Sequence, residues 1–210
     1  MKPNTDGKTA LEFWEERYEA ATGETSGKPS LALARYAEGR KVGDALDLGC
    51  AKGDDVVWLA QKGWHVCGVD ISQAALAHSA ANAARNGVAD LTRFEQHDLS
   101  KSFPVGAFDL ITANFLQTPY DFPWEAVIKR AASAIKPGGL LLAVTHERVA
   151  PWSWGDPKLE LPSAQERLSK LALPKADWNA VFVGPIDREA KGPKDERLSV
   201  RDAVIALERV

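Results

Sequence analysis

Short apolar runs alternate with longer amphipathic stretches from residue 44 to residue 145, and this alternation constrains the fold more than any other feature of the sequence. The pattern is typical of βα units that fold onto a parallel sheet. Two later apolar segments are placed to pair antiparallel at one edge of that sheet. We therefore expect an α/β chain with a doubly wound, mostly parallel, seven-stranded sheet and an antiparallel C-terminal hairpin. The expected strands are Asp44–Leu48, His65–Val69, Leu91–Gln96, Phe108–Ala113, Leu140–Val144, Trp178–Val183 and Ser199–Leu207.

Start and stop signals place the helices between these strands. Ser72 is a good N-cap for the alanine-rich stretch Gln73–Arg85, and Asn86-Gly87 supplies its stop. Helices are also expected at Asp54–Lys62, with Gly63 at its left-handed end, and at Trp124–Ile135. Lys136-Pro137-Gly138-Gly139 suits a tight turn before the fifth strand.

The chain is expected to form one globular domain, residues 41–210, preceded by a helical cap or lid segment, residues 1–40. Within that segment Ala10–Ala20 has Leu11, Trp14 and Tyr18 on one side, which suits a helix over the mouth of a site.

Charge and composition restrict the class of partner. The chain has 26 Lys and Arg against 29 Asp and Glu, a net charge of −3, so it lacks the broad positive field that nucleic-acid binding needs. Its longest apolar run, Leu140–Val144, is far too short to span a membrane, and residues 1–9 are polar with no apolar stretch behind them. We expect a cytoplasmic monomer or homodimer with a small-molecule partner. Cys50 and Cys67 lack the spacing of a metal site or a disulfide framework and are expected to be reduced and buried.

The segment Asp47-Leu48-Gly49-Cys50-Ala51-Lys52-Gly53 runs from a strand, through a turn with two glycines, into a helix. Open α/β sheets bind ligands at the carboxyl ends of strands, where glycines let the backbone approach the ligand. Asp70 ends the second strand, 21 residues after Gly49, where a carboxylate commonly accepts hydrogen bonds from ribose hydroxyls. The alternative is a purely structural role, in which the glycines allow close packing of the helix and Asp70 caps a helix.

The charges beside this turn distinguish between adenosine cofactors. A dinucleotide calls for G-x-G-x-x-G, but position 51 is Ala, and Asp54 and Asp55 open the helix at the place where a pyrophosphate would bind. Two carboxylates would repel a pyrophosphate, whereas S-adenosyl-L-methionine carries a sulfonium and an ammonium. The charge balance therefore favours the methyl donor.

Residues 44–145 resemble the class I S-adenosylmethionine-dependent methyltransferases. Four segments carry the resemblance: Asp47–Gly53, Gly68-Val69-Asp70-Ile71-Ser72, Phe108-Asp109-Leu110-Ile111 and Lys136-Pro137-Gly138-Gly139. It implies a Rossmann-like sheet, S-adenosyl-L-methionine as cofactor and S-adenosyl-L-homocysteine as product. It also implies a set of cofactor contacts: Asp47, Gly49, Ala51 and Gly53 toward the methionine part, Asp70 toward the ribose, Ile71 and Asp98-Leu99 toward the adenine, and Asn114 toward the ammonium. The family usually has Gly at the position of Ala51, and Asp98 could instead cap the segment that follows it.

Residues 178–209 resemble the C-terminal part of the tellurite-resistance methyltransferases, in which a His-Arg pair and a further Arg line the acceptor pocket. Arg188 and Arg197 match those arginines by spacing, while Asp187 stands in the place of the His. The alternative is that these arginines are solvated charges on a hairpin. His146 follows the fifth strand, where it could act as a general base or be purely structural.

The sequence thus predicts a methyltransferase that acts on a small molecule by in-line transfer, with a thiol or chalcogen acceptor and with His146, Arg188 and Arg197 as candidate catalytic groups. A small aromatic or carboxylate metabolite, methylated on O or N, is an alternative acceptor. A non-catalytic S-adenosylmethionine-binding protein and a nicotinamide-dependent oxidoreductase are rival functions. Trp14, Tyr18, Trp152 and Trp154 are expected to border the mouth of the site or to pack under loops.

Overall fold

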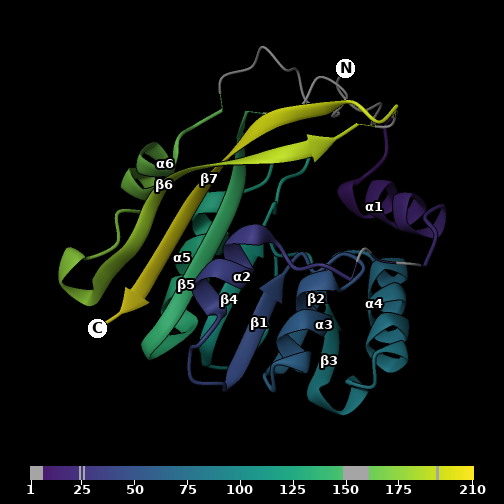
Figure 1. The fold of residues 1–210 in the computed structure, drawn as a ribbon, viewed down its shortest axis with the longest axis horizontal. Helices are drawn as coiled ribbons and strands as arrows, with labels where there is room; N and C mark the ends of the chain where they lie inside the picture. The colour runs from purple at the N-terminus through teal and green to yellow at the C-terminus, as the bar shows by residue number, and fades with distance from the viewer. Residues whose placement is uncertain (1–6, 24, 26, 149–160, 193) are drawn as a thin grey trace.

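The computed structural model describes residues 7–23, 25, 27–148, 161–192 and 194–210. These residues build one seven-stranded sheet in the order β3-β2-β1-β4-β5-β7-β6, with helices on its faces (Figure 1). The strands are β1 Asp44–Leu48, β2 His65–Asp70, β3 Thr92–Gln96, β4 Phe108–Asn114, β5 Ile135–Arg148, β6 Trp178–Lys191 and β7 Arg197–Arg209.

The pairing directions confirm the expected fold class. β1 pairs in parallel with β2 and β4, and β2–β3 and β4–β5 are parallel as well. The C-terminal hairpin of β6 and β7 is antiparallel, and β7 also joins β5 antiparallel. The parallel strands all end at the same edge of the sheet. Successive strands are added in one direction from β1 to β3 and in the other direction from β4 onward, and such sheets bind ligands at this switch point between β1 and β4.

The described helices are α1 Ala10–Glu19, α2 Leu31–Ala37, α3 Asp54–Gln61, α4 Gln73–Arg85, α5 Trp124–Ala134 and α6 Ala164–Leu171, with short 3-10 turns at Ala89–Leu91 and Lys175–Asp177. Ser72 caps α4 as predicted, because its hydroxyl accepts from the N–H of Ala75. Gly63 follows α3 with a φ of +94°, which only glycine adopts without strain.

Two helices were not predicted. The seven-residue α2 is too short for its periodicity to show, although Ser30 caps it. The start of α6 carries a full capping box between Ser163 and Glu166, so the sequence held a local signal for this helix.

The clearest difference from prediction lies in β5, which runs from Ile135 to Arg148 rather than from Leu140 to Val144. Its register against β4 shifts between the pairs Phe108–Ile135 and Leu110–Leu140, so residues 136–139 form an irregular insertion within the strand. Gly138 has the positive φ, +76°, that the predicted turn required. At β3, Leu91 belongs to the preceding 3-10 turn rather than to the strand.

Two apolar cores cover the two faces of the sheet. One contains side chains from α5 and α6, such as Val127, Ile128 and Leu171, and the other contains side chains from α2, α3 and α4, such as Leu33, Leu59 and Leu76. The helix α1 buries no residue and lies beyond the end of α4 (Figure 1). Helices thus cover both faces of the sheet with buried side chains, whereas α1 packs at the periphery without burying any of its own.

Candidate functional site

A pocket lies at the carboxyl ends of the parallel strands and is closed on one side by α1. It combines the turn after β1, the ends of β2 and β3, the segment after β4 and one face of α1. The lining residues are Ala10, Trp14, Tyr18, Gly49, Asp70, Ile71, His97, Asp98, Leu99, Ser100, Phe115, Leu116, Gln117, Thr118, Tyr120, Asp121 and Phe122.

The turn after β1 has the backbone conformation that its glycines suggest. Gly49 and Gly53 have φ of +75° and +83°, and a Cβ at Gly53 would lie 2.8 Å from the hydroxyl oxygen of Ser79. A Cβ at Gly49 would lie 2.8 Å from Cδ1 of Leu116. Ala51 also lies in the left-handed region, with φ of +51°, so the methyl group at this position does not prevent the turn.

Asp70 connects this turn to the end of β2. Its Oδ2 accepts from the N–H of Ala51 at 3.0 Å, and its Oδ1 accepts from the N–H of Ser72 at 3.0 Å. Ser72, not Asp70, caps α4. Each carboxylate oxygen has a second lone pair, so Asp70 can still accept hydrogen bonds from a ligand in the pocket that it lines.

Three carboxylates lie around the turn: Asp47 and Asp70 are buried and Asp55 is partly buried. Burial raises the pKa of Asp47 well above its ordinary value, and the charges of Asp55 and Asp70 raise it further. Burial also raises the pKa of Asp55 and of Asp70, although hydrogen bonds partly offset this. Among the described residues no Lys or Arg forms an ion pair with any of the three. A bound cation would favour their ionised forms.

Asn114, at the end of β4, has an unused acceptor in the same region. Its amide nitrogen donates to Oδ2 of Asp55 at 2.8 Å and to the hydroxyl of Thr112 at 2.6 Å. Its Oδ1 is buried and has no hydrogen-bond partner among the described residues. Buried polar atoms are rarely left unpaired, so this oxygen is free to accept a hydrogen bond from a donor outside the described residues.

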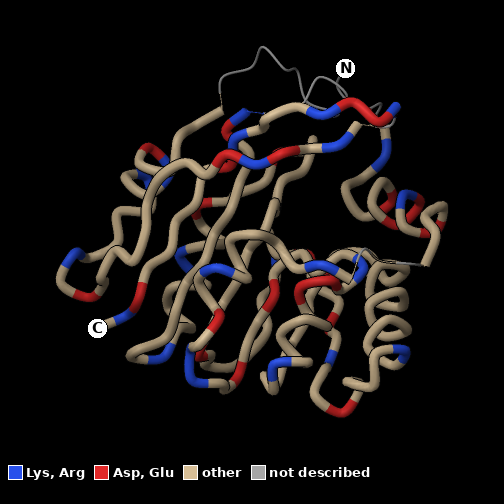
Figure 2. Tube along the Cα trace, viewed as in Figure 1, with Lys and Arg blue, Asp and Glu red and all other residues tan. Residues whose placement is uncertain are grey.

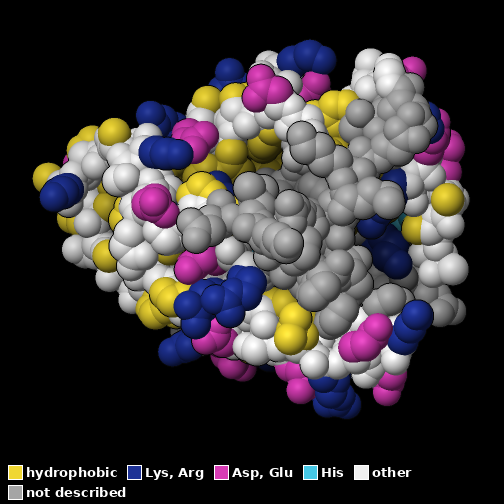
Figure 3. Space-filling view, turned by 90° about the horizontal axis from the view of Figure 1, so that it is seen from above, with side chains coloured by type: hydrophobic (Ala, Val, Ile, Leu, Met, Phe, Trp, Pro, Cys, Tyr) yellow, Lys and Arg dark blue, Asp and Glu magenta, His cyan; other side chains and the backbone are white. Residues whose placement is uncertain are grey.

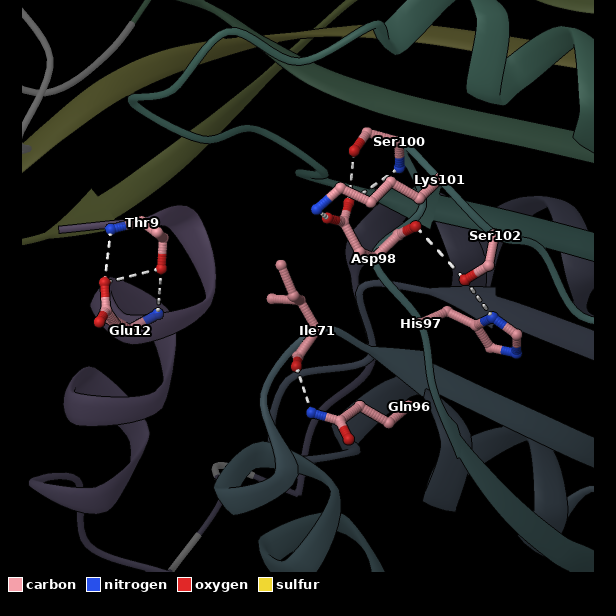
Figure 4. A network of polar contacts seen from close by, with 9 residues as sticks. All are labelled: Thr9, Glu12, Ile71, Gln96, His97, Asp98, Ser100, Lys101 and Ser102. Atoms are coloured by element: carbon pink, nitrogen blue, oxygen red, sulfur yellow. Dashed lines mark hydrogen bonds and ion pairs between the residues drawn. The ribbon is translucent and has the colours of Figure 1, made fainter.

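The opposite end of the pocket is built by Ile71 and the segment after β3. Figure 4 shows the Ile71 side chain between α1 and this segment, with the backbone oxygen of Ile71 accepting from Gln96 at 2.9 Å. Asp98 accepts from the N–H and hydroxyl of Ser100 and pairs with Lys101 at 2.7 Å. Partial burial raises the pKa of Asp98, but these bonds outweigh it and hold the pKa below its ordinary value. No helix begins at Asp98, so it caps a turn while it lines the pocket.

Aromatic side chains from α1 and from the segment after β4 form the remaining wall. The indole N–H of Trp14 donates to the hydroxyl of Thr118 at 3.3 Å, and Trp14 stacks on Tyr18 with ring centroids 6.0 Å apart. Trp152 and Trp154 lie outside the described residues. Residues 115–122 were missed as site residues, although aromatic and polar side chains directly after a predicted strand were a usable signal.

The structure brings most, but not all, of the predicted cofactor residues to this pocket. Gly49, Asp70, Ile71, Asp98 and Leu99 line it directly. The other four are not in the lining: Asp47, Ala51, Gly53 and Asn114. Ala51 and Gly53 belong to the turn after β1, and Ala51 donates to Asp70. Asp47 is close enough to Asp70 for their charges to interact, and Asn114 donates to Asp55 at the start of α3.

The three candidate catalytic residues lie outside the pocket lining. His146 stacks on Phe115, and Arg188 pairs with Asp202. Arg197 pairs with the exposed Glu189 at 2.7 Å and lines a shallow groove on the hairpin together with Arg188. Figure 2 shows Lys and Arg interspersed with Asp and Glu along this hairpin. The positive charge of Arg197 is therefore neutralised by Glu189 on the neighbouring strand.

The chain is similar to known methyltransferases in sequence. Residues 45–139 match a family model described as "Methyltransferase domain". Ribosomal RNA small subunit methyltransferase C of Alcanivorax borkumensis is 33% identical over 135 residues, which cover 60% of this chain and 40% of that protein. Probable thiol methyltransferase 2 of Arabidopsis thaliana is 31% identical over 143 residues, covering 62% of this chain and 60% of that protein. The chain thus spans less than two thirds of these relatives.

Solved structures share the fold at lower identity. The structure described under "Conversion of a Disulfide Bond into a Thioacetal Group during Echinomycin Biosynthesis" aligns with a TM-score of 0.72 at 21% identity, covering 95% of this chain and 92% of that one. TehB from Haemophilus influenzae aligns with a TM-score of 0.67 at 14% identity, covering 94% and 67%. N-methyltransferase NodS from Bradyrhizobium japonicum, solved with S-adenosyl-l-homocysteine, aligns with 0.61 at 16%, covering 99% and 91%.

These matches support the expected cofactor, S-adenosyl-L-methionine. They span several classes of acceptor, so they leave the acceptor open. Of the described helices, none has the length and apolar character needed to cross a membrane. Figure 3, which views the molecule from above, shows acidic and basic side chains together on that face rather than basic ones alone.

Proposed function

We propose that this chain, in which residues 45–139 form a methyltransferase domain of the class I type, is an S-adenosylmethionine-dependent methyltransferase that methylates a small molecule. Its residues contribute binding, alignment and exclusion of water, since methyl transfer from a sulfonium is an in-line displacement. The acceptor we favour is a thiol or another chalcogen nucleophile.

One observation carries the choice of cofactor: the buried Oδ1 of Asn114 has no partner among the described residues and lies near the buried carboxylate of Asp47 and the partly buried one of Asp55. A ligand with an ammonium would donate to Asn114 and offset the negative charge, and a sulfonium would add to that effect. A pyrophosphate in the same place would be repelled by both carboxylates. This argues against a nicotinamide dinucleotide.

The pocket lining supports a small, uncharged acceptor. The described lining residues include no Lys or Arg, whereas Asp70, Asp98 and Asp121 are among them. The aromatic wall suits a soft or planar group, and an anion would meet several carboxylates and no Lys or Arg among the described lining residues. This lining favours a neutral thiol over an oxyanion, and Arg188 and Arg197 lie outside it. A neutral phenol or amine would fit the same wall and is the second candidate.

Calorimetric titration with S-adenosyl-L-methionine, S-adenosyl-L-homocysteine and NADH tests the cofactor. We expect both sulfur ligands to bind and NADH to be ignored, and the reverse result would overturn the proposal. Asn114→Ala should weaken the binding of S-adenosyl-L-methionine at least ~10-fold, because a hydrogen bond to a charged group contributes about 1.5–3 kcal/mol. The same variant should leave 5′-methylthioadenosine, which lacks the amino-acid part, unaffected.

Mass spectrometry after incubation with S-adenosyl-L-methionine tests the acceptor. The panel contains thiols, selenite, tellurite, phenols, amines and carboxylates. We expect methylated thiols and no methylated carboxylate or tellurite. If the cofactor binds tightly and nothing in the panel is methylated, the chain is a binding protein rather than an enzyme.

A further inference from the structure

Three polar side chains from β5, β6 and β7 meet outside the pocket lining. Asp202 is buried, with 6% of its side chain exposed, and it accepts from Nε of Arg188 at 2.5 Å. Its other oxygen, Oδ1, lies 3.1 Å from Nδ1 of His146. The register of β7 against β5 and β6 brings the three side chains together, since His146 lies opposite Asp202 and Arg188 lies two positions beyond the residue opposite Asp202.

This group of three contacts the back of the pocket wall. The ring of His146 stacks on Phe115 with centroids 4.5 Å apart and an interplanar angle of 26°, and Arg188 lies over the same ring. The backbone N–H of His146 donates to Oε1 of Gln117 at 3.0 Å. Phe115 and Gln117 both line the pocket. His146 therefore lies directly against two residues of the pocket wall without belonging to the lining itself.

The backbone of Phe115 has an unusual conformation at this contact. Phe115 has a φ of +57°, a conformation that a bulky residue adopts only when its surroundings impose it. The stack against His146 is one of those surroundings, and the bond between the backbone N–H of Phe115 and the oxygen of Val144 is another. Residues held in such conformations concentrate at functional sites.

The carboxylate determines the tautomer of the histidine. Because Asp202 can only accept at Nδ1, the neutral imidazole carries its proton on Nδ1 and presents a lone pair at Nε2. No described residue forms a hydrogen bond with Nε2, and 30% of the His146 side chain is exposed. A carboxylate that orients an imidazole in this way also stabilises the imidazolium formed when Nε2 takes a proton.

We propose that Asp202 is a positioning residue that holds His146 as the proton acceptor for the methyl acceptor. The inference rests on the proposed function. The S–H bond of a thiol breaks and its proton goes to Nε2 of His146. The sulfur electron pair forms the bond to the methyl carbon, and the C–S bond of the sulfonium breaks to leave a neutral thioether. An acceptor that is already a thiolate has no proton to lose and does not need His146.

The first test reads the tautomer directly and needs no activity. Nitrogen-15 NMR of the full-length protein, labelled at histidine and assigned with His146→Gln, should show Nδ1 protonated and Nε2 unprotonated in neutral His146. Asp202→Asn should shift the population toward the other tautomer. A wild-type His146 protonated at Nε2 would overturn the proposal, whether or not the protein binds S-adenosyl-L-methionine.

The second test compares two thiols that differ in ionisation. Near neutral pH 2-mercaptoethanol is mostly protonated, whereas 4-nitrothiophenol is mostly thiolate. His146→Gln should lower kcat/KM about 100-fold with 2-mercaptoethanol, the low end of general-base effects, and leave it unchanged with 4-nitrothiophenol. Asp202→Asn should also lower kcat for 2-mercaptoethanol, by no more than the ~100-fold loss expected when His146 itself is removed, with little change in KM.

The charged groups around His146 determine how its role depends on pH and which variant serves as a control. The charged groups that face His146 are Asp202 from β7 and Arg188 from β6, and the charged residues beside them in the strands are Glu147, Arg148 and Arg201. Arg201→Gln removes the exposed pair with Asp187 and should match wild type in every measurement. Raising the pH should restore the 2-mercaptoethanol rate of His146→Gln as the thiolate forms.

Separate outcomes distinguish the two proposals. If titration shows no binding of S-adenosyl-L-methionine, the proposed function fails, while the tautomer result still decides the role of Asp202. Equal losses with both thiols would show that His146 only supports the wall, and this would overturn the inference. A wild type that binds the cofactor and methylates neither thiol would overturn it as well.

Discussion

The backbone N–H of Ala51 donates a 3.0 Å hydrogen bond to Oδ2 of Asp70. This bond joins the turn after β1 to the end of β2, so the two segments with the strongest sequence signals form one structural unit. Asp70 therefore has two tasks in the proposed site: it fixes the position of the turn and it presents its remaining lone pairs to the pocket.

Replacing Asp70 with Ala should weaken S-adenosyl-L-methionine binding at least ~10-fold, or ~1.4 kcal/mol, because a charged acceptor for the ribose hydroxyls is lost. Calorimetric titration measures the affinity. Asp90→Ala, which removes an exposed carboxylate in the 3-10 turn before β3, is the matched control and should bind like wild type. Equal affinity of the Asp70 variant and wild type would rule out the ribose contact.

Ala51→Gly should raise the free energy of unfolding by ~0.5 kcal/mol. The left-handed conformation costs an L-residue ~1–2 kcal/mol, and the extra freedom of an unfolded glycine offsets ~0.5–1 kcal/mol of the relief. Urea unfolding measures the change. Ala81→Gly, at an exposed position inside α4, should do the opposite and cost ~1 kcal/mol. A loss of stability in both variants would show that the turn at Ala51 is unstrained.

Asp47→Asn should make the protein without cofactor more stable at neutral pH. The folded-state pKa of Asp47 is raised above its unfolded value, so between these two values only the folded state holds the proton. Folding stability then falls as the pH rises through this window, and the loss is complete above the folded pKa. The variant has no such group, so its advantage should grow with pH to on the order of 1 kcal/mol, or a Tm increase of ~2–4 °C.

Urea unfolding at several pH values from 5 to 8, with Asp90→Asn as the exposed control, checks this prediction. The same Asp47 variant should bind S-adenosyl-L-methionine more weakly, because it lacks the negative charge near the ligand's ammonium. If the stability difference between Asp47→Asn and wild type does not change with pH, burial does not raise the pKa of Asp47 in the folded protein.

The fold was predictable where local signals and tertiary packing agree. Asp44–Leu48 and Gln73–Arg85 match β1 and α4 residue for residue. The strand is a short segment bounded by Gly43 and Gly49, and the helix is rich in alanine between its N-cap Ser72 and the stop at Asn86-Gly87. The bounds of β5 were not predictable, since Lys136-Pro137-Gly138-Gly139 reads locally as a turn and becomes part of the strand only through pairing with β4. The long ends of β6 and β7 likewise depend on their mutual pairing.

The candidate site was predictable at the strand ends and not beyond them. Gly49 and Asp70 were identifiable because parallel strands end at one edge, and that edge binds ligands. The link between His146 and Asp202 spans 56 residues and depends on the register of β5 against β7, so no local pattern could reveal it. The same register explains why Arg188 meets Asp202 while Arg197, matched by spacing alone, lies at an exposed ion pair.

The helix α1 belongs to residues 1–40, the segment predicted to form a lid, and we expect it to slow the release of the cofactor. Trp14 is the residue that tests this. The helix buries no side chain, and few polar contacts hold it, among them Trp14 Nε1 to Thr118 and Glu15 to the N–H of Ala74. Trp14→Phe keeps an aromatic ring in the wall but removes the N–H donor. A neutral hydrogen bond contributes ~1 kcal/mol, so the dissociation rate of S-adenosyl-L-methionine should rise ~5-fold with little change in the association rate.

Thr118→Val removes the same bond from the other side and should raise the dissociation rate by a similar factor. The double variant should then be no faster than either single variant, because both remove one shared interaction, and this non-additivity isolates the Trp14–Thr118 contact. Surface plasmon resonance with immobilised protein measures the rates. Additive effects would mean that each side chain acts through separate packing contacts, and unchanged rates in all three variants would show that α1 does not close over the bound cofactor.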